Sequence, residues 1–188
     1  MPNPRTLTCR CGQMQWQVAP TAPGTHVVCY CADCQTAAQA LGAADMLDEA
    51  GGTAIFQTLP ADVTITQGAG HLALMQLGPK GLYRWHAGCC GTPIANTLSG
   101  PKFSFCGMVL PPDATGFGNP TAHVQTEAAR TPVNGHGFAA TGLAIARRAL
   151  AARLSGRWRH TPFFDSAGQP VAPPRILSLE DRTAARPR

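Results

Sequence analysis

Grouped cysteines are the residues of this sequence whose types and spacing could do chemistry. Five of the eight cysteines form two tight groups, at residues 9–11 and 29–34, and the others follow much later, as the adjacent pair at 89–90 and Cys106. Tight groups separated by long intervals are typical of metal ligands, and zinc takes thiolate ligands in a tetrahedral arrangement. We therefore predict a zinc-binding protein.

The group at residues 29–34 predicts a metal site with an open position. Cys29, Cys31 and Cys34 follow the spacing Cys-x-Cys-x-x-Cys, which lets three thiolates converge on one ion from one short turn. Structural zinc sites are closed by four protein ligands, whereas catalytic sites keep one position free. Because this spacing supplies no obvious fourth ligand, we expect an open site.

The group at residues 9–11 predicts a second site that joins distant segments. Cys9 and Cys11 supply only two ligands, so they need another pair, and the stretch 86–90 is the only later segment dense enough to provide it. That stretch ends in the adjacent Cys89 and Cys90, and two neighbouring thiols rarely point at one atom unless the backbone bends. Cys106 lies in an apolar run, "FSFCGMVL", and we interpret it as a core residue.

Short β-type segments occupy the first 110 residues and must position these cysteines. Runs rich in Val, Ile, Thr and aromatic residues alternate with gaps that contain Gly, Pro and Asp. This pattern predicts antiparallel strands. The expected strands cover residues 14–19, 26–31, 53–59, 62–67, 71–77, 82–87, 92–98 and 102–110.

The sequence changes character after residue 110. We predict a zinc-binding β domain over 1–110 and a C-terminal extension over 111–188 that packs on the same domain. Leu143, Ala146, Leu150 and Leu154 recur at helical spacing, and Gly156 is placed to end the run. This predicts an amphipathic helix over about 141–156, followed by an extended tail with two apolar clusters that dock on the core, Phe163-Phe164 and Ile176-Leu177-Leu179.

Composition limits the class of protein. A chain of 188 residues with 44% hydrophobic residues can bury one sizeable core. The formal net charge is +5, and ten of the 15 basic residues follow position 129. Neither a secretory leader nor an apolar run long enough to span a membrane is visible, so we expect a cytoplasmic protein with no membrane partner.

Three cysteine motifs together resemble a known family. The sequence shows Cys9-Arg10-Cys11-Gly12, then Cys29-Tyr30-Cys31-Ala32-Asp33-Cys34-Gln35, then Cys90-Gly91-Thr92-Pro93. In kind and order these resemble the motifs of the glutathione-dependent formaldehyde-activating enzymes and their relatives, which include centromere protein V. The resemblance covers about residues 5–110. It implies a β-tent fold with two zinc sites, a structural one from the outer pairs and a functional one from Cys29, Cys31 and Cys34.

The third motif departs from the family pattern at one ligand. If Cys90 aligns with the last family cysteine, the expected partner three residues earlier falls on Ala87, which cannot bind a metal. The replacement could be Cys89 or His86, and we favour Cys89 because thiolate-rich sites are typical of the family. A third possibility is an outer site without metal, in which Cys9, Cys11, Cys89 and Cys90 stay free thiols.

The resemblance implies carbon–sulfur lyase chemistry. A small thiol such as glutathione would approach zinc held by Cys29, Cys31 and Cys34, and its thiolate would add to or leave a small carbonyl carbon. The alternative is a non-catalytic zinc-stabilised binding module, and a fourth protein ligand at the inner site would favour it. A redox-active dithiol at Cys89-Cys90 is a third interpretation.

The arginines of the predicted helix raise the question of an acidic partner. Arg147, Arg148, Arg153, Arg157 and Arg159 lie in or just after it. No aromatic interleaving and no recognisable nucleic-acid motif accompany them, so we expect a solvated polar face and no nucleic-acid partner. No feature of the sequence indicates an oligomeric state.

Overall fold

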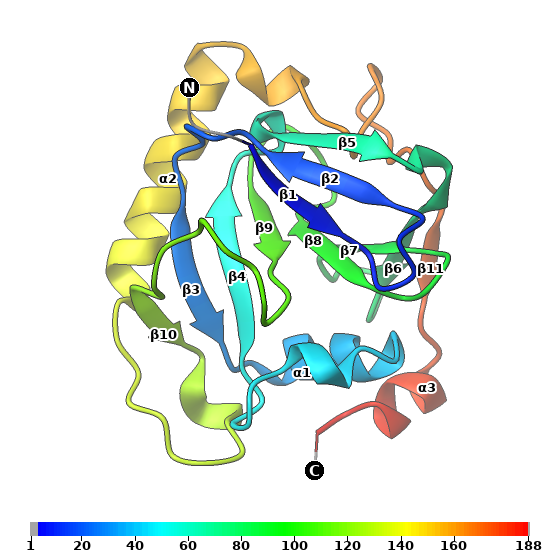
Figure 1. The fold of residues 1–188 in the computed structure, drawn as a ribbon, viewed down its shortest axis with the longest axis vertical. Coiled ribbons are helices and arrows are strands. Elements are labelled where there is room, and N and C mark those ends of the chain that lie inside the picture. The colour runs from blue at the N-terminus through cyan, green and yellow to red at the C-terminus, as the bar shows by residue number, and fades with distance from the viewer. Residues whose placement is uncertain (1–3, 188) are drawn as a thin grey trace.

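The fold is mainly β, as predicted, and the computed structural model describes residues 4–187 (Figure 1). The strands are β1 (Arg5–Thr8), β2 (Gln15–Val18), β3 (Thr25–Cys29), β4 (Thr53–Thr58), β5 (Val63–Gln67), β6 (Leu72–Gln76), β7 (Tyr83–Ala87), β8 (Pro93–Thr97), β9 (Cys106–Val109), β10 (Ala122–Val124) and β11 (Pro174–Ile176). The α-helices are α1 (Ala32–Ala40), α2 (Phe138–Leu154) and α3 (Leu179–Ala184). All eight strands predicted from the sequence are confirmed, with bounds that differ by a few residues.

The strands form two sheets. One sheet has the order β1-β2-β5, and the other has the order β10-β3-β4-β9-β8-β7-β6-β11. The pairs inside the first 110 residues are antiparallel, as predicted. The two edge strands of the larger sheet pair in parallel instead: β10 is parallel to β3, and β11 is parallel to β6. The C-terminal segment thus supplies both edge strands of the larger sheet, and these cover edges that would otherwise be free to pair with another chain.

One apolar cluster packs the two sheets together. It includes Trp16 of the smaller sheet and Trp85 and Ile94 of the larger one, all with exposed fractions of 1% or less. Phe163 is fully buried in the same cluster, and its ring centroid lies 5.1 Å from that of Trp85. The predicted docking of the Phe163-Phe164 cluster on the core is therefore confirmed. In the second predicted cluster only Leu177 is buried, whereas Ile176 and Leu179 are 48% and 80% exposed, so that part of the prediction is wrong.

Helix α2 starts three residues earlier than the predicted segment 141–156, and it presents a different face to the protein. Its buried residues are Thr141, Ala149 and Ala152, whereas Leu150 and Leu154 are 60% and 80% exposed. The leucines that indicated an amphipathic helix therefore do not form its buried face. Small side chains let the backbone of α2 lie close to the sheet, and this close approach determines which face is buried.

Helix α1 was not predicted, although its sequence, "ADCQTAAQA", is rich in strong helix formers. Its N-cap is Cys31, whose Sγ accepts a hydrogen bond from the backbone N–H of Cys34. A sulfur in place of the usual Ser, Thr, Asp or Asn hid this helix start from sequence reasoning. Within residues 4–187, no helix has both the length and the hydropathy of a membrane-spanning segment.

Candidate metal centres

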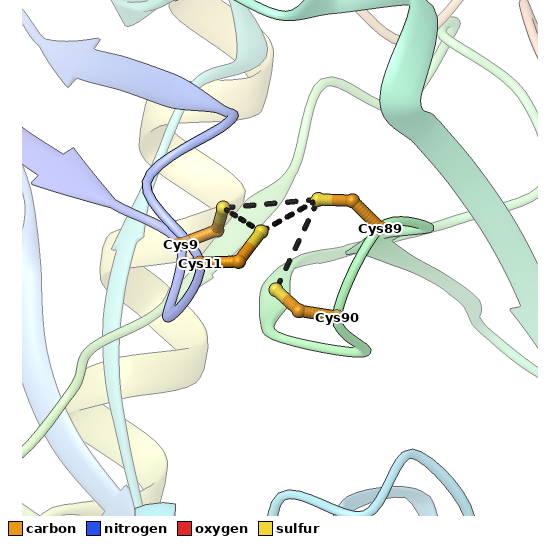
Figure 2. Close-up of side chains that lie close together, drawn as sticks. All are labelled: Cys9, Cys11, Cys89 and Cys90. Carbon is orange, nitrogen blue, oxygen red and sulfur yellow. Dashed lines mark hydrogen bonds between the residues drawn. The ribbon is translucent and has the colours of Figure 1, made fainter.

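The outer group of cysteines forms where two loops meet. Cys9 and Cys11 lie in the loop between β1 and β2, and Cys89 and Cys90 lie in the turn between β7 and β8. Figure 2 shows the four side chains pointing toward one another from these two loops. The four sulfur atoms all lie within 4.8 Å of one another, so the structure brings together four residues that the sequence separates by about 80 positions.

The sulfur–sulfur distances suit a tetrahedral ion. The Sγ atom of Cys89 lies 3.3 Å from that of Cys11, 3.8 Å from that of Cys9 and 3.9 Å from that of Cys90. Four thiolates at Zn–S bonds of about 2.3 Å would stand about 3.8 Å apart. The residues therefore fit a closed four-sulfur site.

The two adjacent cysteines point the same way because the turn bends sharply. The backbone N–H groups of Cys90 and Gly91 both donate to the carbonyl oxygen of Ala87. Gly91 has a φ of +73°, and a Cβ at this position would overlap the backbone oxygen of Leu41. Only glycine meets both conditions. His86 is not in the sulfur group, and its Nδ1 lies 3.3 Å from the backbone oxygen of Arg84.

Arg10 and Thr92, to which the sequence assigned no role, hold this site together. The Thr92 hydroxyl accepts a hydrogen bond from the backbone N–H of Arg10 and lies 3.1 Å from Cys90 Sγ. Although partial burial opposes the effect, hydrogen bonds from Thr92 and from the backbone of Cys11 lower the pKa of Cys90 to about 6. The signal for Thr92 was present in the Cys-Gly-Thr-Pro motif.

The inner group lies where β3 passes into α1. Cys29 ends β3, Cys31 caps α1, and Cys34 lies in the first turn of that helix, so a strand end and a helix start replace the predicted short turn. The three sulfur atoms lie within 4.8 Å of one another, and Cys29 Sγ lies 3.8 Å from Cys34 Sγ. Across the part of the chain that the structure describes, no fourth His, Cys, Asp or Glu belongs to this group.

Hydrogen bonds within the inner group, together with burial, raise the pKa of Cys29 and of Cys34, whereas the sulfur of Cys31 favours a negative charge. Hydrogen bonds from the thiols of Cys29 and Cys34, and then from the backbone N–H of Cys34, hold the pKa of Cys31 well below its ordinary value. The start of a helix carries a partial positive charge, which acts in the same direction. Arg84, with an exposed fraction of 5%, adds a positive charge that favours the thiolate form of Cys31 and partly offsets the raised pKa of Cys34.

The donor sets limit which metals fit. Both groups offer sulfur only, and thiolate ligands select zinc, copper(I) or iron–sulfur centres over magnesium or calcium. Cys106 belongs to neither group; it is fully buried in the core, in agreement with its prediction. The two groups could therefore hold one metal ion each, the outer with four ligands and the inner with three.

Comparisons with known proteins place the chain in one family. A comparison with curated proteins finds no significant match. A crystal structure of a Rhodobacter sphaeroides protein from the Northeast Structural Genomics effort is similar at 20% identity and a TM-score of 0.40, covering 55% of this chain and 82% of that one. Residues 1–173 match a family of unknown function, DUF6151. The match spans most of the sequence, and the chain belongs to the DUF6151 family.

Proposed function

We propose that Cys29, Cys31 and Cys34 hold a zinc ion with one free coordination position, and that this centre carries carbon–sulfur lyase chemistry on a thiol adduct. The observation that supports the proposal most directly is the ligand count. Three sulfurs converge, and residues 4–187 provide the group with no fourth protein ligand. A site of three protein ligands leaves room for a substrate, as in catalytic zinc sites.

The sequence resemblance supplies the reaction class. By analogy with the glutathione-dependent formaldehyde-activating enzymes, the substrates would be a small thiol such as glutathione and a small aldehyde. The thiol sulfur forms a bond to the carbonyl carbon, the π electrons of the carbonyl move to its oxygen, and the thiol proton ends on that oxygen. The reverse reaction breaks the same carbon–sulfur bond, so no oxidant or reductant is needed.

The residues around the inner group are suited to such a step. A bound zinc ion would supply a Lewis acid and would favour the thiolate form of an approaching thiol. Cys31 holds its sulfur at the positive end of α1, and Arg84, which is buried, contributes a positive charge and lines a small cavity together with Cys34. Asp33 lies exposed in the first turn of α1 and is not a member of the sulfur group.

The outer group has a structural role in this proposal. Four sulfurs from two loops would close a zinc site that joins the β1–β2 loop to the β7–β8 turn. On the basis of the sequence resemblance, we also propose that the arrangement of the two sheets is a β-tent. We propose that the protein resides in a reducing compartment such as the cytoplasm, because oxidised cysteines cannot bind zinc.

One observation favours the alternative, a zinc-stabilised binding module without catalysis. Helix α2 exposes Leu143, Leu150 and Leu154, and it contains basic residues but no acidic ones. An exposed apolar stripe of this kind can mark a contact surface. In that case the metal sites would stabilise the fold, and a partner on α2 would account for the function.

An exchange assay separates the two functions. We would measure, by NMR exchange spectroscopy, the rate at which glutathione and formaldehyde interconvert with their adduct in the presence of zinc-loaded protein. The proposal predicts an acceleration that Cys31→Ser abolishes. The matched control is Cys106→Ala, which removes a thiol outside both groups and should keep the acceleration wherever the variant folds.

Two results would overturn the proposal. One is a zinc-loaded wild-type protein that leaves the exchange rate unchanged, which would support the binding module. The other is a Cys31→Ser variant with full activity, which would mean that the inner sulfurs do not carry the reaction.

A further inference from the structure

A small cavity adjoins the inner cysteine group. It has a volume of about 20 Å³, and its lining includes Cys34 and Leu41, which belong to or directly follow α1, and Arg84 and Asn96 on β7 and β8. About 10 to 15 Å³ is enough for one water molecule, so the cavity receives one small polar group of a ligand and not a whole larger molecule. The cavity therefore places such a group next to the proposed reaction centre.

Arg84 is a buried cation without a carboxylate partner. Its exposed fraction is 5%, and its guanidinium is charged at every physiological pH. The ion pairs found in residues 4–187, Arg10–Asp45 and Arg157–Asp62, do not include it. Among the described residues, the Arg84 side chain donates a 3.4 Å hydrogen bond from Nη1 to Asn96 Oδ1, and its Nε has no hydrogen-bond partner. The negative groups that act on Arg84 are the sulfurs of Cys31 and Cys34, which leaves its buried Nε–H group without a hydrogen-bond acceptor, so this donor calls for a ligand that can accept from it.

A second polar group without a partner lines the same cavity. Thr53 is 6% exposed, and its hydroxyl oxygen has no hydrogen-bond partner among the described residues. It lies on β4 directly opposite Cys29 on β3, whereas Arg84 lies on β7 opposite Asn96 on β8. Two different strand pairs thus bring unpartnered donors to one small space beside Cys34.

We propose that Arg84, Asn96 and Thr53 form an anion site that takes the carboxylate group of a small ligand. A carboxylate accepts hydrogen bonds from a guanidinium fork and from a hydroxyl, and its charge would neutralise Arg84. Leu41 and Met46 give the rest of the cavity lining an apolar surface. Where this inference extends to the substrate, it rests on the proposed function: the aldehyde would carry a carboxylate on the carbon next to its carbonyl group.

A titration with two ligands of equal shape tests the anion site. Acetate and acetamide differ in charge and hardly in size, and the Nε–H resonance of Arg84 can be followed in ¹⁵N-labelled, zinc-loaded, full-length protein at constant ionic strength. We expect acetate to shift this resonance in a saturable way, and acetamide to leave it unchanged. Arg84→Gln should weaken acetate binding at least tenfold.

The control is Arg148→Gln. Arg148 is a half-buried arginine, but it donates to Thr25, neither residue lines this cavity, and the substitution should not affect acetate binding. The melting temperature and zinc content of each variant show whether it has folded. If Arg84→Gln does not fold, the comparison of acetate with acetamide on the wild-type protein still tests whether the anion site exists.

Three outcomes would overturn the anion site: no saturable shift with acetate, equal shifts with acetamide, or acetate binding that is unchanged in Arg84→Gln. The last would place acetate on the metal or elsewhere. Because acetate is not consumed, this result is independent of the exchange assay. Loss of acetate binding would leave the lyase proposal standing, and loss of exchange activity would leave the anion site standing.

Discussion

The guanidinium of Arg10 donates a hydrogen bond from Nη2 to the backbone carbonyl oxygen of Cys90 over 2.7 Å. Its Nη1 donates to the backbone oxygen of Gly42, just after α1, over 2.9 Å. Arg10 stands between Cys9 and Cys11 in the sequence, so one side chain ties the first cysteine loop to the second and to the end of α1. The outer sulfur group thus depends on a contact that is not made by sulfur.

Substitution of Arg10 by Gln is expected to loosen the outer site without affecting the inner one. A lost hydrogen bond of about 1 kcal/mol corresponds to roughly a fivefold change in an equilibrium. We therefore predict that Arg10→Gln transfers one of its two zinc ions to a coloured chelator about five times faster than the wild type. The matched control is Arg147→Gln, an exposed arginine on α2. Identical transfer rates for all three proteins would contradict the prediction.

Gly91 is expected to tolerate no side chain. Gly91→Ala places a Cβ against the Leu41 carbonyl oxygen and forces alanine into a left-handed conformation, which alone costs about 1 to 3 kcal/mol. We predict a lower melting temperature and partial loss of zinc. Gly142→Ala is the control, because it lies in α2 with free space around it and replaces a poor helix former. A Gly91→Ala protein as stable as the wild type would show that the turn adopts another conformation.

Cys106 is expected to be the least reactive thiol. Burial raises its pKa, and its side chain has no exposed surface. In zinc-free folded protein, iodoacetamide should modify Cys106 at least ten times more slowly than the exposed Cys11, because the thiolate is the reactive form. Mass spectrometry of tryptic peptides gives both rates, and a denatured sample shows the rates without burial. Equal rates in the folded protein would contradict the placement of Cys106 in the core.

Substitutions on the buried face and on the exposed face of α2 are expected to change the free energy of unfolding by different amounts. Ala152 is 1% exposed, so Ala152→Leu should overpack the contact with the sheet and lower the free energy of unfolding by about 1 to 3 kcal/mol. Leu150 is 60% exposed, and Leu150→Gln should change the same quantity by less than about 0.5 kcal/mol. Urea unfolding measures both. A larger loss of stability in Leu150→Gln than in Ala152→Leu would mean that the leucine face of α2 is the buried one.

Much of the β architecture was predictable, because strand sequences carry their signal locally. Alternating apolar residues and turn residues were sufficient to find eight strands. The helix face was not predictable, since Leu150 and Ala152 differ in a property that depends on the packing distance between α2 and the sheet. Three strands, β1, β10 and β11, were not predicted. For β10 and β11 the reason is related: each is only three residues long and exists through its pairing with a distant partner.

The cysteine groups were predictable in their membership and only partly in their construction. Spacing identified Cys29, Cys31 and Cys34, and the choice between Cys89 and His86 needed the geometry of the turn at Gly91. Arg84 could not be selected from the sequence, because a charged residue in the strand "YRWHA" usually faces solvent. Its burial and its position beside Cys34 follow from the pairing of four strands across the sheet.

The zinc content of three proteins tests the central claim, which is that two separate cysteine groups each hold one metal ion. Wild type, Cys31→Ser and Cys90→Ser would be purified without oxygen and measured by elemental analysis, together with the melting temperature of each. We predict two zinc ions per wild-type chain and one in each variant, with Cys31→Ser losing the ion that reacts with added thiol. A single ion in the wild type, lost only in Cys31→Ser, would contradict the outer site, and two ions retained in Cys31→Ser would contradict the inner one.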